Sequence, residues 1–186
     1  VSVLIPWGGS CPYRKAAFNY VQEWYKQYYP SWEIVVGESK EGLQWCKAEA
    51  VAHALKESQG DILVIADADC IAPDVGRAAK EVANGSLWTI PHYKLYRLTE
   101  NATSLIVRGE DPRKVANDRG NLSQAAYPGY AGGGITVLRR DVYERVPLDP
   151  RFRGWGQEDE SWALALRLLC GSPWRSDGPI WHLWHP

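Results

Sequence analysis

Two aspartates directly follow a run of apolar residues in the middle of the chain. Residues 62–66 read Ile-Leu-Val-Ile-Ala, and Asp67 and Asp69 come next, separated by one alanine. Five consecutive apolar residues suit a strand buried on both faces of a parallel sheet. Unpaired charges cannot stay inside such a sheet, so the carboxylates are expected at its carboxyl end, where open α/β sheets bind ligands. Two carboxylates there offer hard oxygen ligands to a divalent cation. A simple Asp-containing turn fits the segment equally well.

A second acidic cluster follows a tryptophan that is flanked by two glycines. Gly154-Trp155-Gly156-Gln157 leads into Glu158, Asp159 and Glu160, after which a largely apolar stretch begins. Acidic side chains in the first turn of a helix are stabilised by the helix dipole and need no other role. An exposed ring beside a carboxylate can also hold the face of a sugar while the acid takes a proton. Both interpretations fit this pattern.

The chain ends in a segment rich in tryptophan and histidine, with His182 and His185 three residues apart. Histidine is a common ligand of transition metals, including Mn²⁺. In a flat strand, residues i and i+3 point to opposite faces, so both can bind one ion only if the strand ends between them. Pro186 disfavours a regular continuation. We therefore expect the strand to end near Leu183 and His185 to turn round, although ordinary packing of the two rings is the alternative.

Several weaker signals accompany these clusters. Tyr130 precedes three glycines, of which Gly133 and Gly134 directly precede a short apolar run. Glycines there permit close approach of a ligand to the backbone, or only a bulge. Arg14 and Lys47 stand near predicted strand-to-helix entries and could neutralise a diphosphate, and Glu38 follows a predicted strand and could accept a hydrogen bond from a base. Solvated surface charge is the alternative for all three.

The elements that position these residues alternate between strand and helix. Strands are predicted over 1–6, 33–36, 62–66 and 87–91, and helices over 13–29, 44–58 and 74–83. This alternation predicts an α/β fold with a mostly parallel sheet flanked by helices. Residues 92–126 are irregular apart from a short helix near 102–107, and such a long excursion is often functional. A strand over 135–138, a helix over 157–170 and a strand over 180–184 follow.

Length and composition are those of a single globular domain. The chain has 186 residues, of which 45% are hydrophobic and 23% are charged, and its net charge is −1. A charge so near zero gives no sign of nucleic-acid or membrane-surface binding. The four cysteines are scattered without metal-site spacing and are expected to be free thiols. We find neither a membrane span nor a signal peptide, and we expect a cytoplasmic protein.

The order of these motifs resembles a metal-dependent glycosyltransferase of the GT-A type. The likeness is to the C-terminal domain of β-1,4-galactosyltransferases and to family 2-like glycosyltransferases, and it spans nearly the whole chain. Its most specific element is the Gly-Trp-Gly-x-Glu-Asp motif. The matching residues, in order, are Ile5-Pro6-Trp7, Cys46-Lys47-Ala48, Asp67-Ala68-Asp69, Ile71-Ala72-Pro73, Gly132-Gly133-Gly134, Gly154-Trp155-Gly156-Gln157-Glu158-Asp159 and His182-x-x-His185.

The resemblance implies a metal site and a catalytic base. Asp69 would bind Mn²⁺ or another divalent cation directly, and Asp67 would lie near both the ribose and the metal. His182 and His185 match two late metal-ligand positions. Asp159 would be the base on the acceptor hydroxyl.

It also implies contacts to the two substrates. Glu158 would orient the acceptor, Trp155 would contact both sugars, and Tyr130 would lie beside the donor sugar. The remaining donor-binding positions are Pro6, Trp7, Arg14, Glu38, Lys47, Gly133 and Gly134. The family's basic loop after the first strand is replaced by Trp7-Gly-Gly-Ser-Cys-Pro-Tyr, which leaves Arg14 for that role.

The implied activity is metal-dependent transfer of a sugar from a nucleotide donor, UDP-linked, to an acceptor hydroxyl with inversion. Residues 1–91 would form the nucleotide-sugar-binding half and 92–186 the acceptor-binding and catalytic half. The acceptor could be a glycan, a protein, a lipid or a modified nucleobase. Two other classes fit the residues: a metal-dependent nucleotidyl- or phosphotransferase, which also needs carboxylates at a strand end, and a non-catalytic module that binds carbohydrate or nucleotide.

Overall fold

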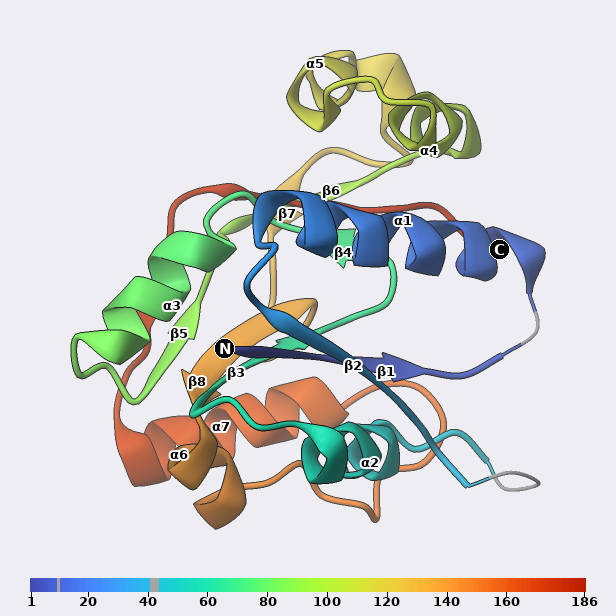
Figure 1. Ribbon diagram of the computed structural model, residues 1–186. Coiled ribbons are helices and arrows are strands. Elements are labelled where there is room, and N and C mark those ends of the chain that lie inside the picture. The colour runs from blue at the N-terminus through green and yellow to red at the C-terminus, as the bar shows by residue number, and fades with distance from the viewer. Residues whose placement is uncertain (10, 41–43) are drawn as a thin grey trace.

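A central sheet divides the molecule into two layers of helices (Figure 1). The computed structural model describes residues 1–9, 11–40 and 44–186. Within these residues six strands form the sheet in the order β2-β1-β3-β8-β5-β9. Their bounds are β1 Ser2–Trp7, β2 Glu33–Glu38, β3 Ile62–Ala66, β5 Trp88–Ile90, β8 Ile135–Arg139 and β9 Trp174–Arg175.

The expected mostly parallel sheet is confirmed, with one antiparallel strand in its middle. Strand β1 runs parallel to β2 and β3, and β5 runs parallel to β9. Strand β8 is antiparallel to both β3 and β5. The chain reaches β8 through the excursion after residue 91, which is long enough to allow a strand of either direction.

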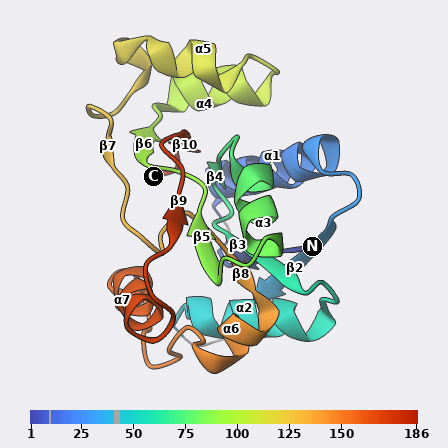
Figure 2. The same cartoon turned by 90° about the vertical axis from the view of Figure 1, so that its left-hand side faces the viewer.

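A second, four-stranded sheet joins the chain end to the residues after Asp69. Its order is β4-β10-β6-β7, with bounds β4 Cys70–Ile71, β6 Lys94–Arg97, β7 Tyr127–Pro128 and β10 Pro179–His182. Strand β10 pairs antiparallel with β4, so that His182 lies opposite Cys70. The C-terminal residues and the segment after β3, far apart in the sequence, are thereby brought side by side (Figure 2).

The helices cover the central sheet on both faces, because alternate residues of each strand point to opposite sides. Val3 and Ile5 face the layer formed by α1 and α3, whereas Leu4 faces the layer formed by α2, α6 and α7. The bounds are α1 Pro12–Tyr28, α2 Lys47–Glu57, α3 Val75–Ala83, α6 Arg140–Arg145 and α7 Glu158–Cys170.

The expectation that residues 92–126 are irregular is wrong for most of that segment. After β6 it forms a small helical lobe of α4 Glu100–Val107, α5 Pro112–Asn117 and the short 3₁₀ helix η1 Arg119–Asn121. The predicted helix near 102–107 is part of α4. The oxygens of Thr99 and Asp111 accept hydrogen bonds from backbone amides and cap α4 and α5. Helices this short show little apolar periodicity, so their caps were the only available signal.

No helix within the described part of the chain is both long and apolar enough to cross a bilayer.

Candidate active site

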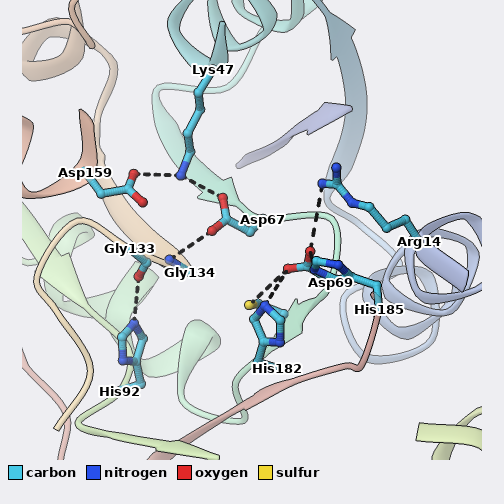
Figure 3. A network of polar contacts seen from close by, with 11 residues as sticks. Arg14, Lys47, Asp67, Asp69, His92, Gly133, Gly134, Asp159, His182 and His185 are labelled. Atoms are coloured by element: carbon cyan, nitrogen blue, oxygen red, sulfur yellow. Dashed lines mark hydrogen bonds and ion pairs between the residues drawn. The ribbon is translucent and has the colours of Figure 1, made fainter. Parts of the chain in front are cut away.

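One cavity of about 520 Å³ gathers most of the residues singled out in the sequence. It opens where β3 ends, beside the glycine-rich entry to β8 and the start of α7 (Figure 3). The predicted site residues that line it are Pro6, Arg14, Lys47, Asp67, Asp69, Tyr130, Gly133, Gly134, Trp155, Glu158, Asp159, His182 and His185.

Two predicted donor-binding side chains lie elsewhere. The ring of Trp7 is buried and stacks on Phe18, with their centroids 4.3 Å apart. Glu38 is exposed at the end of β2, and its backbone amide donates to Nδ1 of His53. Within the part of the chain that the structure describes, neither Trp7 nor Glu38 lines the cavity. Trp7 faces inward because β1 is buried along its whole length.

Asp67 emerges from the sheet at the end of β3, as its sequence position predicts. Its Oδ2 accepts a hydrogen bond from the amide of Gly134 at 3.1 Å, and its own amide donates to the carbonyl of Gly134 at 2.7 Å. Oδ1 lies 2.7 Å from Nζ of Lys47. Two contacts therefore hold the carboxylate at the end of the sheet, and a third holds the backbone of Asp67.

Lys47 joins Asp67 to Asp159. It is the first residue of α2, it is buried, and its Nζ lies 2.7 Å from an oxygen of each carboxylate. Burial alone lowers the pKa of Lys47, but the negative charges of Asp159 and Asp67 outweigh it and hold the pKa above its ordinary value. The lysine therefore stays charged and holds two carboxylates in place (Figure 3).

Asp159 stands in the first turn of α7, and glycine makes its position possible. A Cβ on Gly132 would lie 2.3 Å from the backbone oxygen of Asp159, so only glycine allows the loop to pack against α7. Burial, as the largest cause, and the nearby charge of Asp67 raise the pKa of Asp159 to about 6, against the opposing effect of Lys47. A carboxylate with that pKa is ionised at neutral pH and is basic enough to accept a proton.

The two histidines approach Asp69 from different sides. Oδ1 of Asp69 lies 3.8 Å from Nε2 of His182, and Oδ2 lies 3.2 Å from Nε2 of His185. Strand β10 ends at His182. Beyond it, the amide of Leu183 donates to the backbone oxygen of Asp69 and that of Trp184 to the hydroxyl of Thr103. The expected end of the strand near Leu183 is therefore confirmed, and both histidines lie near Asp69.

Asp69, His182 and His185 carry donor atoms of the types that a divalent transition ion binds, and each histidine lies near an oxygen of Asp69. Burial alone raises the pKa of Asp69, but the hydrogen bond from His185 and the nearby His182 and Arg14 hold it well below its ordinary value. Burial lowers the pKa of His182 and keeps this imidazole neutral, as a ligand must be. One ionised carboxylate with two imidazoles matches the preferences of Mn²⁺ better than those of Mg²⁺.

Arg14 extends from α1 into the cavity with unused hydrogen-bonding capacity. Its NH1 donates to the carbonyl of Gly8 at 3.3 Å, and its NH2 lies 4.0 Å from Oδ2 of Asp69. Its Nε is buried without a hydrogen-bond partner among the described residues. The guanidinium also lies 4.9 Å from the ring centroid of Trp155, a side chain that is 70% exposed. An anionic ligand here would satisfy the orphaned donor.

Among the cavity residues that were not predicted as site residues from the sequence are His92 and Trp45. His92, which is 1% exposed, donates from Nε2 to the carbonyl of Gly133 at 3.2 Å, and burial lowers its pKa to about 4. Its place directly after the strand predicted over 87–91 was the available signal. Trp45 lines the cavity and stacks on Trp155 with centroids 6.5 Å apart. Its position two residues before Lys47 was the corresponding signal.

Sequence comparisons find no match: neither a protein-family model nor a curated protein matches the chain. Solved structures do match, at low identity. A mutant Drosophila β-1,4-galactosyltransferase 7, in complex with manganese, UDP-Gal and xylobiose, is 12% identical with a TM-score of 0.54, and the match covers 99% of this chain and 70% of that one.

Two further structures come from a bacterium and an archaeon. Glucosyl-3-phosphoglycerate synthase from Mycobacterium tuberculosis, in complex with Mn²⁺, UDP-glucose and phosphoglyceric acid, is 17% identical with a TM-score of 0.57, and the match covers 100% of this chain and 72% of that one. A mannosyltransferase from Pyrobaculum calidifontis, in complex with GDP-Man and Mn²⁺, is 14% identical with a TM-score of 0.53, covering 98% and 56%. The TM-scores show a shared fold, which is the GT-A arrangement that the resemblance implied, and identities this low carry the likeness no further than the fold.

Proposed function

We propose that this protein transfers a sugar from a nucleoside-diphosphate donor to an acceptor hydroxyl, in a reaction that depends on a divalent cation. The observation that supports this most is the pairing of two groups in one cavity. The proposed cation ligands Asp69, His182 and His185 lie at one side of the cavity. Asp159, whose carboxylate forms an ion pair with Lys47, lies at the other side. Proteins of the same fold hold Mn²⁺ and nucleotide sugars.

The donor is proposed to be UDP-linked and to bind mainly through residues 1–91 together with the two C-terminal histidines. Two of the structural neighbours hold UDP-sugars. Arg14, whose buried Nε has no partner among the described residues, is the cation best placed to bind the diphosphate. Lys47 is already neutralised by Asp67 and Asp159, and we assign it to positioning these carboxylates.

The chemistry divides between the two ends of the cavity. A cation bound by Asp69, His182 and His185 would stabilise the negative charge that builds on the departing diphosphate. Asp159 accepts the proton of the attacking hydroxyl as the new glycosidic bond forms. Glu158, at the same helix start, orients the acceptor, and Trp155 and Tyr130, which is 69% exposed, border the sugars. Attack from the side of Asp159, opposite the leaving group, inverts the anomeric carbon.

A screen of nucleotide sugars by thermal unfolding tests the proposal directly. A donor that binds only the native state raises the apparent unfolding temperature by mass action. We expect a rise with a UDP-sugar and Mn²⁺ together that neither produces alone. The acceptor remains to be identified among glycans, proteins, lipids and modified nucleobases, so turnover is first measured as release of UDP in the presence of acceptor mixtures.

Two outcomes would contradict the proposal. The protein could instead be stabilised by a nucleoside triphosphate and transfer its phosphoryl or nucleotidyl group. That result would favour the nucleotidyl- or phosphotransferase class. Binding of a nucleotide sugar without hydrolysis or transfer, under every acceptor mixture, would favour the non-catalytic module.

The pH dependence of transfer should report the ionisation of Asp159. Below a pH of about 6 this carboxyl is protonated and cannot accept a proton; above it, the base is ionised. We expect kcat/KM to rise as the pH increases through about 6, since kcat/KM reports groups of the free enzyme. Glu160→Gln should keep this profile, because Glu160 is exposed in the same helical turn. A profile flat between pH 5 and 7 would contradict the role of Asp159.

The cation preference should reveal whether histidine takes part. Because imidazole suits transition ions, wild-type protein should bind the donor more tightly with Mn²⁺ than with Mg²⁺. His185→Ala should reduce this difference with little loss of stability, since His185 is partly exposed near the chain end. His53→Ala, an exposed histidine on α2, is the matched control. Calorimetry of donor binding with each ion measures the effect, and equal affinity with both ions in wild type and variant would rule out the histidine ligands.

A further inference from the structure

A thiol lies beside the proposed metal-binding carboxylate, on the side away from His185. Sγ of Cys70 is 3.4 Å from Oδ1 of Asp69, whereas His185 and Arg14 approach the other oxygen, Oδ2. Cys70 is only 1% exposed, yet it contributes to the lining of the cavity. The two oxygens of Asp69 therefore face different environments.

His182 completes a second donor set on the Oδ1 side. Its Nε2 lies 3.8 Å from Oδ1, and one ligand atom each from Asp69, Cys70 and His182 all lie within 4.8 Å of one another. The cause is the strand pairing: β10 is antiparallel to β4 with His182 opposite Cys70, and Asp69 directly precedes β4. The rigid second sheet thus sets the spacing of all three side chains.

This spacing is close to that of a tetrahedral metal centre. With bonds of roughly 2.3 Å to sulfur and about 2.0–2.2 Å to nitrogen and oxygen, the edges of a tetrahedral zinc site measure about 3.4–3.6 Å. The separations of 3.4 Å for sulfur to oxygen and 3.8 Å for nitrogen to oxygen differ from these by a few tenths of an ångström at most. The sulfur of Cys70 and the ring nitrogen of His182 lie within 4.8 Å of one another, and side-chain rotations that shorten these separations would close the set on an ion.

We propose that Cys70, Asp69 and His182 form a binding site for a thiophilic divalent cation, Zn²⁺ or Cd²⁺, with the fourth coordination position open to the cavity. Sulfur ligands select Zn²⁺ over Mn²⁺, which prefers oxygen and nitrogen. Because this set shares Asp69 and His182 with the set proposed for the donor's cation, the two ions exclude one another. Zn²⁺ then competes with Mn²⁺ for Asp69 and His182.

When the ion binds, the thiol of Cys70 loses its proton, and no group is oxidised or reduced. The thiol S–H of Cys70 breaks, its proton passes to solvent, and the sulfur electron pair forms the bond to the cation. Cys46, also buried, lacks such a set among the described residues: its thiol donates to the carbonyl of Pro150. Cys46→Ser is therefore a matched control for Cys70→Ser.

Cobalt is the probe, because Co²⁺ occupies zinc sites and a thiolate ligand gives it a charge-transfer absorption band in the near ultraviolet. Titration of the reduced wild-type protein with Co²⁺ should produce this band and release a proton, and Zn²⁺ should abolish the band by displacement. The band should be absent from Cys70→Ser and present in Cys46→Ser and His185→Ala. A wild-type protein without the band, or a band that persists in Cys70→Ser, overturns the proposal, whatever the stability of the variants.

Affinity measurements separate this proposal from that of sugar transfer. Cys70→Ser should lower the affinity for Zn²⁺ on the order of 10–100-fold or more, since loss of even an outer metal partner costs that much. Donor binding with Mn²⁺ should persist in Cys46→Ser, because Cys46 contacts the carbonyl of Pro150 and does not line the cavity that the described residues form. Unchanged Zn²⁺ affinity in Cys70→Ser contradicts the sulfur site alone, whereas absence of donor binding in the wild type contradicts the transferase alone.

Discussion

Replacing Asp159 by asparagine is expected to lower the rate of sugar transfer by about 10²–10⁴, the range typical of the loss of a general base. Asparagine keeps the shape of the side chain and can still accept a hydrogen bond from Lys47 through its amide oxygen, so the loop and helix around it should hold. It cannot take the proton of the acceptor hydroxyl. Donor affinity should barely change, because Asp159 lies across the cavity from the proposed cation ligands.

The measurement is transfer at saturating donor, together with donor affinity by calorimetry, in Asp159→Asn and Glu160→Gln. Both changes remove one negative charge from the first turn of α7 and so weaken its favourable interaction with the helix dipole equally. Only the first should lower the rate of transfer by this amount. Near-normal transfer by Asp159→Asn would assign the proton to Glu158 or Glu160, or reduce the acidic cluster to a stabilised helix start.

The position of Asp67 and Asp69 could be predicted because the local sequence pattern and the general rules of burial in a sheet lead to the same result. Five apolar residues need burial, and the first charge after them must lie outside the sheet. The end of the last strand near Leu183 was predictable for a similar reason, since Pro186 cannot continue a strand. In both cases a few adjacent residues were sufficient for the prediction.

The direction of β8 could not be predicted from its own residues. Ile135-Thr-Val-Leu is apolar and β-branched, and such a run suits a buried strand of either direction. Direction depends on the path of the chain from residue 92 to 134, which passes through the strands β6 and β7 and several short helices. The ring of His92 also forms a hydrogen bond with the carbonyl of Gly133, a contact that the local sequence pattern does not predict.

The partners of Lys47 were likewise beyond sequence reasoning. A lysine at a helix start suggests a free cation for phosphate, yet its ammonium binds Asp67 and Asp159, which lie far from it in the chain. The sequence predicted a cation at this position but not its partners, because ion pairs between residues so far apart in the chain depend on how the layers of the fold pack. Cys70 illustrates the same point: the cysteines lack metal-site spacing in the sequence, and strand pairing supplies it in space.

Replacing Asp69 by alanine is expected to abolish cation-dependent binding of the nucleotide sugar while the fold persists. Asp69 is the residue that both His182 and His185 face, so its loss removes the anionic ligand from the centre of the set. The backbone oxygen of Asp69, which accepts from the amide of Leu183, is unaffected. At a donor concentration of about 100 times Kd, the wild type should gain about 2.7 kcal/mol of stability from donor and Mn²⁺, and the variant should gain none.

Thermal unfolding with and without donor and Mn²⁺ measures this difference, and Asp61→Ala is the matched control. Asp61 is exposed and directly precedes β3, at the opposite end of the strand from Asp67 and Asp69. Its replacement removes the same charge from the same strand but leaves the cavity intact, so stabilisation by the donor should equal that of the wild type. If Asp69→Ala still showed Mn²⁺-dependent stabilisation of wild-type size, the cation would have to bind elsewhere, and the assignment of the carboxylates after β3 would be wrong. Loss of binding in both variants would instead mean that the charge of the strand region, and not the ligand at its carboxyl end, governs donor affinity.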